Sequence, residues 1–569
     1  PAREIMRSIQ FLGIFALWAT VPLAYILQGQ DSNWDLQNYH LYNTITLFEG
    51  SFKADIAPAG IQSYFNPLVS LPAYWIHRVA GNPIQSFWAG LALASFQGIC
   101  GPLLFGIART LLSASRLIAF LIAAFGVTSP ILLSEAGTSF ADLTICVLQL
   151  SAVWIGCLSL NTNKPIKLKM LALSWGVLGS ACGIKFSAIF ISPLLLMISL
   201  SSLYSRGKPN ALLNTLKQSA YAIVLPGLIG FVLFGWLWLN RSWADNGNPF
   251  FPLFSSLFGE SSILFCDSRV DTRFLPKNIG EFLLAPFREA LPVPMQRSEL
   301  AYRDLRPLLW VYGGFISLLG SLAIYLKAFI TDSTNRLTGQ PLGWVSFQIG
   351  ILSSYLIWLQ VAGIARYALT IQALSGLSLW ISLSMIADVL QSHKYRSDKL
   401  TTEHQFRRRA LPLVFTGLAT ICISSGIVPN WGRTNFAVSW NTLERLNPNK
   451  ENIAKHQYIP EGKLFPLGRP VVLLDTPLAW LKQYAPSGTS FSLISEQMRP
   501  LAVKRVNQII SQHNDQFTAI SFIGANQLKS ESSVNLLSAQ FNFKTRNCSD
   551  FGTPTGLGIR LCNAELLPE

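Results

Sequence analysis

Charged residues are scarce in this sequence. They make up 13% of its 569 residues, whereas a soluble protein carries about 25%. The sequence also has no glycine-rich phosphate loop, no Walker lysine and no cluster of His and Cys at metal-ligand spacing, and it contains only six histidines. These absences argue against an enzyme that consumes a nucleotide and against a zinc protein.

Hydrophobic residues are abundant instead, at 50% of the chain. Apolar runs close to the roughly 20 residues that cross a bilayer recur from Ile9 to Val428, which predicts an α-helical polytopic membrane protein with about eleven spans. The expected spans are Ile9–Leu27, Ile84–Ala108, Leu117–Leu133, Leu143–Leu160, Met170–Cys182, Ser187–Leu203, Ala220–Leu239, Leu308–Ile330, Trp344–Gln360, Leu369–Leu390 and Leu411–Val428. Around Lys185 a single bent helix is the alternative to two short spans.

Basic residues predict the orientation of these spans. Arg3 and Arg7 precede the first run, and the later lysines and arginines gather in every second connection, most densely between Lys394 and Arg409. The positive-inside rule therefore places the N-terminus in the cytoplasm and, after an odd number of spans, the C-terminus outside. The net charge of +15 is explained by this topology, so no nucleic-acid partner is predicted.

Two domains are expected. Residues 1–428 would form the transmembrane domain, with long outer loops at 28–82 and 241–306, and the more polar residues 429–569 would form a small α/β domain outside the membrane. In that domain the patterns predict strands at 469–475, 489–495, 517–524 and 556–562, and helices at 476–485, 499–513 and 526–541. Cys548 and Cys562 could form a disulfide in an oxidising compartment, although spacing alone does not show whether their Cβ atoms meet.

The first outer loop opens with "DSNWDLQNYHLYN", residues 31–43, which is unusually rich in acids, amides and aromatic rings. Such a mixture suits sugar binding, whereas a loop that is merely solvated does not need it. On a helix, Asp35 and Tyr39 would share one side, and an apolar flank from Leu36 to Phe48 could lie along the membrane surface. The candidate site residues here are Asp31, Asp35, Asn38, Tyr39, His40 and Tyr42.

Further charges interrupt apolar sequence elsewhere. Lys185 in "GIKFS" and Arg366 in "GIARYAL" either face a partner within the membrane part or reach the interface from a span end. Arginines of the second outer loop suit phosphate oxygens, but they could equally pair with the acids around them. The substrate-binding candidates outside the first loop are Lys185, Arg241, Asn248, Asp304, Arg306, Arg366 and Tyr367, and Glu135 and Asp142 could close the same site.

An acidic residue soon after the first span, followed by "WDLQNYHLYNTITLFEGSF", resembles the first outer loop of the GT-C membrane glycosyltransferases. The similar branch contains the protein mannosyltransferases and aminoarabinose transferases. "GIKFSAIFISP", "WLWLNRSWADNGNPFFPLF" and "RYALTIQALSGL" look like other recurring segments of that family. The resemblance covers most of the membrane part through short motifs, and the role of the soluble tail does not transfer.

The resemblance implies a bacterial inner-membrane enzyme that moves a monosaccharide from a polyprenyl-phosphate donor to a lipid, glycan or protein acceptor, on the periplasmic side and with inversion. Asp35 matches the catalytic acid and would be the general base. The second acid of the family motif is Leu36 here, so either Asp31 replaces it or the metal-binding role is absent. Since some GT-C families use a divalent cation, Mg²⁺ or Mn²⁺, a metal stays an open expectation.

Two other functions fit parts of the pattern. A transporter would also have many spans and buried charges, but it should show inverted repeats or paired broken helices, and no such internal symmetry is visible. A ligase or polymerase of whole glycans would favour a very large late outer loop rich in Arg and His, whereas the polar residues here follow the first span. We therefore favour the monosaccharide transferase.

Overall fold

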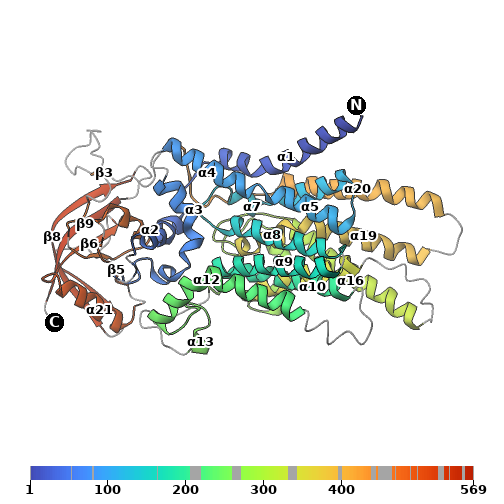
Figure 1. Ribbon diagram of the computed structural model, residues 1–569. Coiled ribbons are helices and arrows are strands. Elements are labelled where there is room, and N and C mark those ends of the chain that lie inside the picture. Colours follow the sequence, from blue (N-terminus) through green and yellow to red (C-terminus); the bar gives the residue numbers. More distant parts are fainter. Residues whose placement is uncertain are drawn as a thin grey trace.

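The computed structural model describes residues 2–50, 52, 54–79, 83–162, 164–204, 219–258, 271–330, 342–394, 400–437, 444–445, 464–467, 469–486, 488–495, 498–522, 531–536, 539–553 and 558–567. A bundle of long helices lies side by side, and a sheet domain caps one end of it (Figure 1). The N-terminus lies toward the other end of the bundle and the C-terminus within the sheet domain.

Every predicted span lies largely in one helix or in two consecutive helices. The helices of the bundle are α1 (Ala2–Gln28), α4 (Pro83–Gln97), α5 (Cys100–Leu112), α6 (Arg116–Val127), α7 (Pro130–Ser134), α8 (Asp142–Ser159), α9 (Lys164–Ile184), η6 (Phe186–Ile191), α10 (Ser192–Tyr204), η8 (Ala220–Val224), α12 (Leu225–Asn246), α16 (Arg306–Ile330), α17 (Leu342–Val361), η10 (Ala365–Ala368), α18 (Leu369–Ala373), α19 (Ser375–Lys394) and α20 (Leu400–Ser425). The α-helical polytopic class is confirmed.

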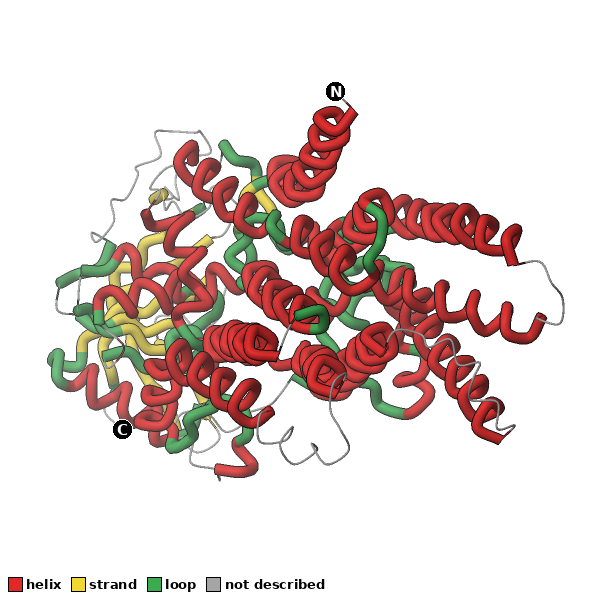
Figure 2. The backbone as a smooth tube through the Cα atoms, turned by 45° about the vertical axis from the view of Figure 1, so that its right-hand side comes forward, coloured by secondary structure: helices red, strands yellow, loops and turns green. Residues whose placement is uncertain are grey.

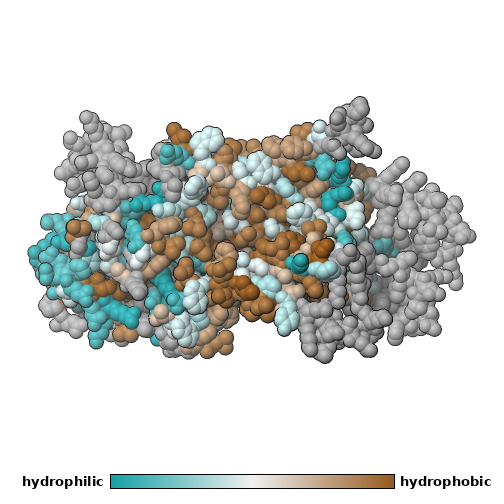
Figure 3. Space-filling view, in the orientation of Figure 1, coloured by the Kyte–Doolittle hydropathy of each residue, from teal (hydrophilic) through white to brown (hydrophobic). Residues whose placement is uncertain are grey.

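By length and composition, six helical segments of the described chain are able to cross a membrane. A seventh is the pair Ala365–Ala373 and Ser375–Leu390, which is bent by 51°. Helices Arg116–Val127 and Ala410–Ser425 are apolar but shorter, so the count of eleven stays a prediction. Hydrophobic side chains gather over the middle of the molecule and hydrophilic ones over the sheet end, as expected for a bilayer around the bundle (Figure 3).

The segment around Lys185 forms two helices rather than one. The backbone of Lys185 is extended, with φ −139° and ψ 117°, so α9 ends at Ile184 and a new helix begins at Phe186. Glycines of α9 face backbone atoms of α12 so closely that a Cβ at Gly179 or Gly183 would collide with α12. Small residues of this kind let two helices approach in lipid, where hydrophobic burial does not drive association.

The tail forms a seven-stranded sheet with one helix of ordinary length, α21 (Pro500–Ser511), as the predicted α/β pattern requires (Figure 2). Parallel pairing joins β4 to both β5 and β6, and antiparallel pairing joins β6 to β9, β9 to β8, and β8 to β3 and β7. The strands are β3 (Glu444–Arg445), β4 (Val471–Leu473), β5 (Phe491–Leu493), β6 (Gln516–Phe522), β7 (Glu531–Leu536), β8 (Ala539–Gly552) and β9 (Gly558–Leu566).

Most elements predicted for the tail are confirmed, and one is wrong. The four predicted strands coincide with β4, β5, β6 and β9, the segment 476–485 contains the 3₁₀-helix η11 (Ala479–Tyr484), and 499–513 contains α21. The helix expected at 526–541 is instead the β7–β8 hairpin in its described part, because residues 531–536 pair with residues 539–544 and this cross-strand pairing overrides local helix propensity. The Cys548–Cys562 disulfide is present and joins β8 to β9.

The first loop packs against the sheet domain, and the expectation that its apolar flank lies on the membrane surface is wrong. The loop contains η1 (Leu36–His40), α2 (Leu41–Glu49), η3 (Gly60–Tyr64), η4 (Pro67–Ser70), α3 (Leu71–Ala73) and η5 (Tyr74–Val79). Leu36, Leu41 and Ile45 are buried in one core with Leu473 and Trp480 of the tail. Only Phe48, at the end of that flank, is exposed.

A short ribbon completes this junction. β1 (Gln30–Asp31) follows α1 directly and pairs antiparallel with β2 (Arg433–Thr434), which follows α20. The second loop carries α13 (Ser255–Phe258), α14 (Ile279–Leu283) and α15 (Ala285–Glu289), of which α15 packs beside α16. The first loop is therefore fixed between the first helix, the last helix and the sheet.

Candidate active site

Asp35 lies where the chain turns from the β1 ribbon into η1, at the end of the bundle that carries the sheet domain. Arg366 Nη1 donates to Asp35 Oδ2 at 2.8 Å, and the Tyr39 hydroxyl donates to the same oxygen at 3.4 Å. Arg366 comes from η10, between α17 and α18 and 331 residues further along the chain. The two side chains keep 12% and 13% of their surface exposed, so a ligand could still reach the pair.

A second ion pair stands beside the first. Lys185 Nζ lies 2.5 Å from Asp142 Oδ1, at the start of α8. The ring of Tyr367 lies 5.1 Å from Lys185 Nζ and 5.7 Å from the Arg366 guanidinium, so one aromatic ring contacts both cations. The structure therefore brings Asp35, Lys185, Arg366 and Tyr367 together from three separate parts of the sequence.

Aromatic rings enclose the Arg366 guanidinium on further sides. Phe140 lies 4.6 Å and Trp431 5.7 Å from its central carbon. Cation–π contact stabilises the charge without using any of the N–H donors. Nε of Arg366 accordingly has no hydrogen-bond partner in the described chain, so the guanidinium has donor capacity left for a ligand.

The protonation state of Asp35 follows from these neighbours. Burial favours the neutral acid, but the Arg366 guanidinium outweighs it and holds the pKa of Asp35 below its usual range. Glu135 shows the opposite balance, because burial and then the Asp142 carboxylate raise the pKa of Glu135 well above its usual range. At neutral pH Asp35 is thus an anion that can accept a proton, whereas the surroundings of Glu135 favour its neutral form.

Several buried polar atoms near Asp35 lack a partner within the described residues. They are His40 Nε2, Asn38 Oδ1, Asp142 Oδ2 and both carboxylate oxygens of Glu135. The other ring nitrogen of His40 lies 2.8 Å from the Ser70 hydroxyl, which fixes the ring. Burying such atoms without partners costs free energy, so each of them could pair with a polar group of a bound ligand.

Three other first-loop and second-loop candidates have structural partners. Asp31 accepts from the Ser139 backbone N–H at 2.6 Å and from the side chain of Asn33 at 2.6 Å, so it joins β1 to the turn after α7. The Tyr42 hydroxyl points to Asp55 rather than to Asp35, at 3.0 Å. Asn248 accepts from Phe250 N–H and donates to the Leu253 carbonyl, which closes a turn. Asp31 lies in β1 and therefore outside the helical segment that follows Asp35.

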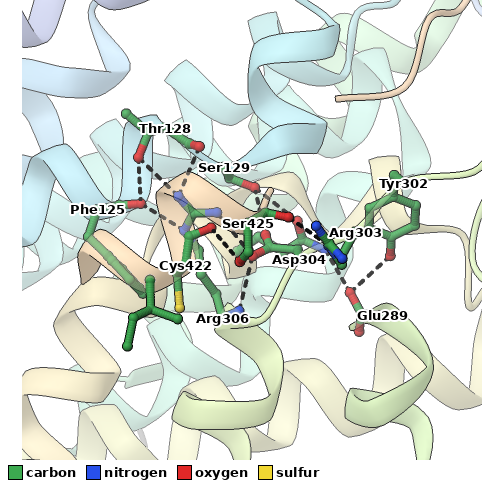
Figure 4. Close-up of polar contacts among 12 residues, drawn as sticks. Phe125, Thr128, Ser129, Glu289, Tyr302, Arg303, Asp304, Arg306, Cys422 and Ser425 are labelled. Carbon is green, nitrogen blue, oxygen red and sulfur yellow. Dashed lines mark hydrogen bonds and ion pairs between the residues drawn. The ribbon is translucent and has the colours of Figure 1, made fainter. Parts of the chain in front are cut away.

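Arg241 and the Asp304–Arg306 pair also lie apart from this constellation. Arg241 donates to the Ser63 carbonyl and stacks between the rings of Phe52 and Tyr64. Arg306 pairs with Asp304 at 3.0 Å, and both side chains are fully buried (Figure 4). Ser129 lies within hydrogen-bond distance of the other oxygen of Asp304, at 3.4 Å, so this cluster ties α16 to the end of α6.

A divalent cation does not fit the described residues. They contain no group of three or more His, Cys, Asp or Glu side chains placed to hold a metal ion. Asp35 Oδ2 accepts from Arg366 and Tyr39, and both carboxylate oxygens of Asp31 accept from Asn33 or Ser139. The chemistry below uses no metal.

Two contributors gave no local signal in the sequence. Trp431 follows the last helix and reaches Arg366, and Phe140 sits in a short turn before α8. Each is an ordinary aromatic residue near a span end, where such residues are common. Only the tertiary arrangement, which no short motif encodes, shows that they face a functional arginine.

Similarity to known proteins is found among solved structures. No protein-family model matches the chain, and no curated protein matches it. Among solved structures, the chain is similar to the crystal structure of ArnT from Cupriavidus metallidurans bound to undecaprenyl phosphate, over 97% of each chain, at 11% identity and a TM-score of 0.44. Likeness at this level concerns the course of the backbone and assigns no residue a role.

Proposed function

We propose that this protein is an integral-membrane glycosyltransferase that moves a monosaccharide from a polyprenyl-phosphate donor to an acceptor hydroxyl at the membrane face carrying the sheet domain. The proposed orientation makes this the periplasmic side of a bacterial inner membrane. The observation that carries the proposal is the pairing of an anionic Asp35 with Arg366 beside Lys185, among unpartnered buried polar atoms at the bundle end.

In this proposal Asp35 is the general base. Its carboxylate takes the proton of the acceptor hydroxyl as that oxygen attacks the anomeric carbon, and the carbon–oxygen bond to the phosphate breaks on the opposite face. Base catalysis of this kind contributes about 10²- to 10⁴-fold to the rate. Tyr39 donates to Asp35 and orients it, while Asn38, His40 and Glu135 are the groups placed to bind sugar hydroxyls.

The leaving polyprenyl phosphate is an anion, and two cations are placed to meet it. Among the described residues, Arg366 uses one N–H for Asp35 and Nε has no partner, while Lys185 Nζ contacts Asp142 and the Tyr367 ring. Before donor binds, the carboxylates neutralise both cations. When the donor phosphate takes the place of one of these carboxylates, each cation still has an anionic partner. The electrostatic cost of binding the donor is therefore low.

The test compares the wild type with Asp35→Asn in lipid nanodiscs. Each is supplied with a panel of polyprenyl-phosphate sugars and crude acceptor lipids, and released polyprenyl phosphate is measured. Asp35→Asn should lower turnover by at least about 100-fold, whereas Asp550→Asn, on the distant strand β8, should leave it unchanged. Full activity of a folded Asp35→Asn protein would refute the role of Asp35. Absence of donor consumption by the wild type would refute the transferase and direct work to transport assays.

A further inference from the structure

The sheet domain reaches into the first loop through a buried ion pair. Lys482 Nζ donates to both oxygens of Asp55, at 2.8 and 2.7 Å, and to the Thr489 carbonyl at 3.0 Å. The two side chains are only 2% and 0% exposed and come from positions 427 residues apart. Asp55 also accepts from the Phe491 backbone N–H at 2.9 Å and from the Tyr42 hydroxyl at 3.0 Å.

Backbone pairing continues this contact. Ile56 donates to the Phe491 carbonyl at 2.9 Å and accepts from the Leu493 N–H at 3.1 Å, so the loop adds a short parallel partner to the edge of β5. Main-chain bonds of this kind fix register and direction as well as distance. The loop therefore belongs structurally to the sheet domain.

The contact leads toward the site along one short helical segment. Tyr42, which holds Asp55, lies in α2, and α2 continues η1 without a break. η1 carries Tyr39, whose hydroxyl contacts Asp35, and the intervening Leu41 is buried in the core shared with the tail. A change at Lys482 can thus alter the placement of Asp35 although the two residues do not touch.

We infer that the sheet domain is a positioning device for the reaction, with Lys482 and Asp55 as positioning residues that hold the η1–α2 segment so that Asp35 faces Arg366. This inference rests on the proposed function for its chemical meaning. It gives the tail a role in the site itself, beyond covering it.

The test uses Lys482→Met, Asp55→Asn and the double variant in the full-length protein. Each single change leaves the partner buried without its counter-charge, and misplacement of a reacting group by about 1 Å costs on the order of 100-fold. We expect turnover per folded molecule to fall roughly 10- to 100-fold in each single variant. Turnover in the double variant should fall by much less than the product of the two single-variant factors, because Lys482 and Asp55 act as one unit.

Two readouts separate positioning from general destabilisation. Amide hydrogen exchange of residues 36–46 should rise roughly tenfold in Lys482→Met, while exchange in the α9–α12 pair stays unchanged. The acid limb of the pH–rate profile should also move to higher pH, since Asp35, which faces Arg366, Lys185, His40 and Tyr39, would lose part of its contact with Arg366. General destabilisation would raise exchange in the α9–α12 pair as well, and a smaller folded fraction would leave the acid limb where it is.

The matched control is Arg560→Gln, which breaks an ion pair of β8 and β9 that faces solvent and should change neither readout. Wild-type turnover or wild-type exchange in Lys482→Met would overturn the inference. If exchange rises in Lys482→Met but the wild type consumes no donor, the coupling stands and the transferase proposal fails.

Discussion

Two Asp–Arg pairs in this protein look alike by distance and differ in what surrounds them. Arg306 binds Asp304 and in addition donates to the Phe125 carbonyl, the Thr128 carbonyl and the Thr128 hydroxyl, at 2.9 to 3.0 Å (Figure 4). Arg366 binds Asp35 through one nitrogen and leaves Nε without a partner in the described chain. The first arginine is saturated by the protein and the second is not.

On the proposed function, the difference separates a structural pair from a functional one. A buried arginine whose three guanidinium nitrogens all bind the protein connects secondary-structure elements and has little left for a ligand. An arginine that rests on aromatic rings keeps its charge stable while its donors stay available. The sequence presents both arginines in the same way, as a basic residue at the edge of an apolar run, and only the count of partners distinguishes them.

Removing the saturated arginine should have the largest effect on stability. Arg306→Met leaves Asp304 buried without a counter-charge, and it removes the donors to Phe125 and Thr128. We expect a loss of about 3–5 kcal/mol in the free energy of unfolding. Thermal unfolding in detergent, followed by intrinsic tryptophan fluorescence, measures it. A loss below about 1 kcal/mol would contradict the structural role.

Removing the unsaturated arginine should act mainly on the reaction. In Arg366→Gln we expect kcat/KM for donor consumption to fall about 10²- to 10³-fold, as when one donor to a developing anion is lost. Since Arg366 holds the pKa of Asp35 down against burial, the acid limb of the profile should move to higher pH. A pH series on nanodisc-embedded protein measures both effects. An unchanged acid limb would show that Arg366 does not control the protonation of Asp35.

A third pair, Arg560 with Asp550, should contribute least to the free energy of unfolding. Arg560 makes two bonds of 2.8 Å to Asp550, as short as those of the buried pairs, but both residues are partly exposed. Exposed pairs contribute about 0.2–1 kcal/mol, so Arg560→Gln should barely change the unfolding temperature. A loss as large as that of Arg306→Met would mean that bond count, and not burial, decides the contribution of these pairs.

Hydropathy predicted the helices of the bundle well, because a run of apolar residues long enough to cross a bilayer is visible in the local sequence. The break at Lys185 and the strands β4, β5, β6 and β9 were likewise visible as local patterns. The helix expected at 526–541 is wrong, because its residues pair across the β7–β8 hairpin. Local propensity therefore did not decide between a helix and a hairpin in this segment.

The candidate site divides in the same way. The first loop was recognisable by composition, and Asp35 by its resemblance to a family motif, so the sequence predicted where to look. Arg366 and Lys185 were two of several candidate charged residues, and nothing in the sequence marked them as neighbours of Asp35. Asp55 and Lys482 were not candidates, because no sequence pattern pointed to them. Arg366 contacts Asp35 across 331 residues of sequence, and Lys482 contacts Asp55 across 427. One sequence does not reveal contacts of this range.

The ribbon between β1 and β2 has a consequence for biosynthesis. Gln30 and Ser32 emerge early from the ribosome, but their partners Asn435 and Gly432 are about 400 residues away. At ordinary elongation rates the early segment waits roughly 20 to 80 seconds for them. During that interval the helices can insert one after another, while the loop that carries Asp35 has neither its ribbon nor its sheet. On the proposed function, a chain interrupted before Gly432 would lack the contacts that hold the Asp35 loop, and it would be inactive in the membrane.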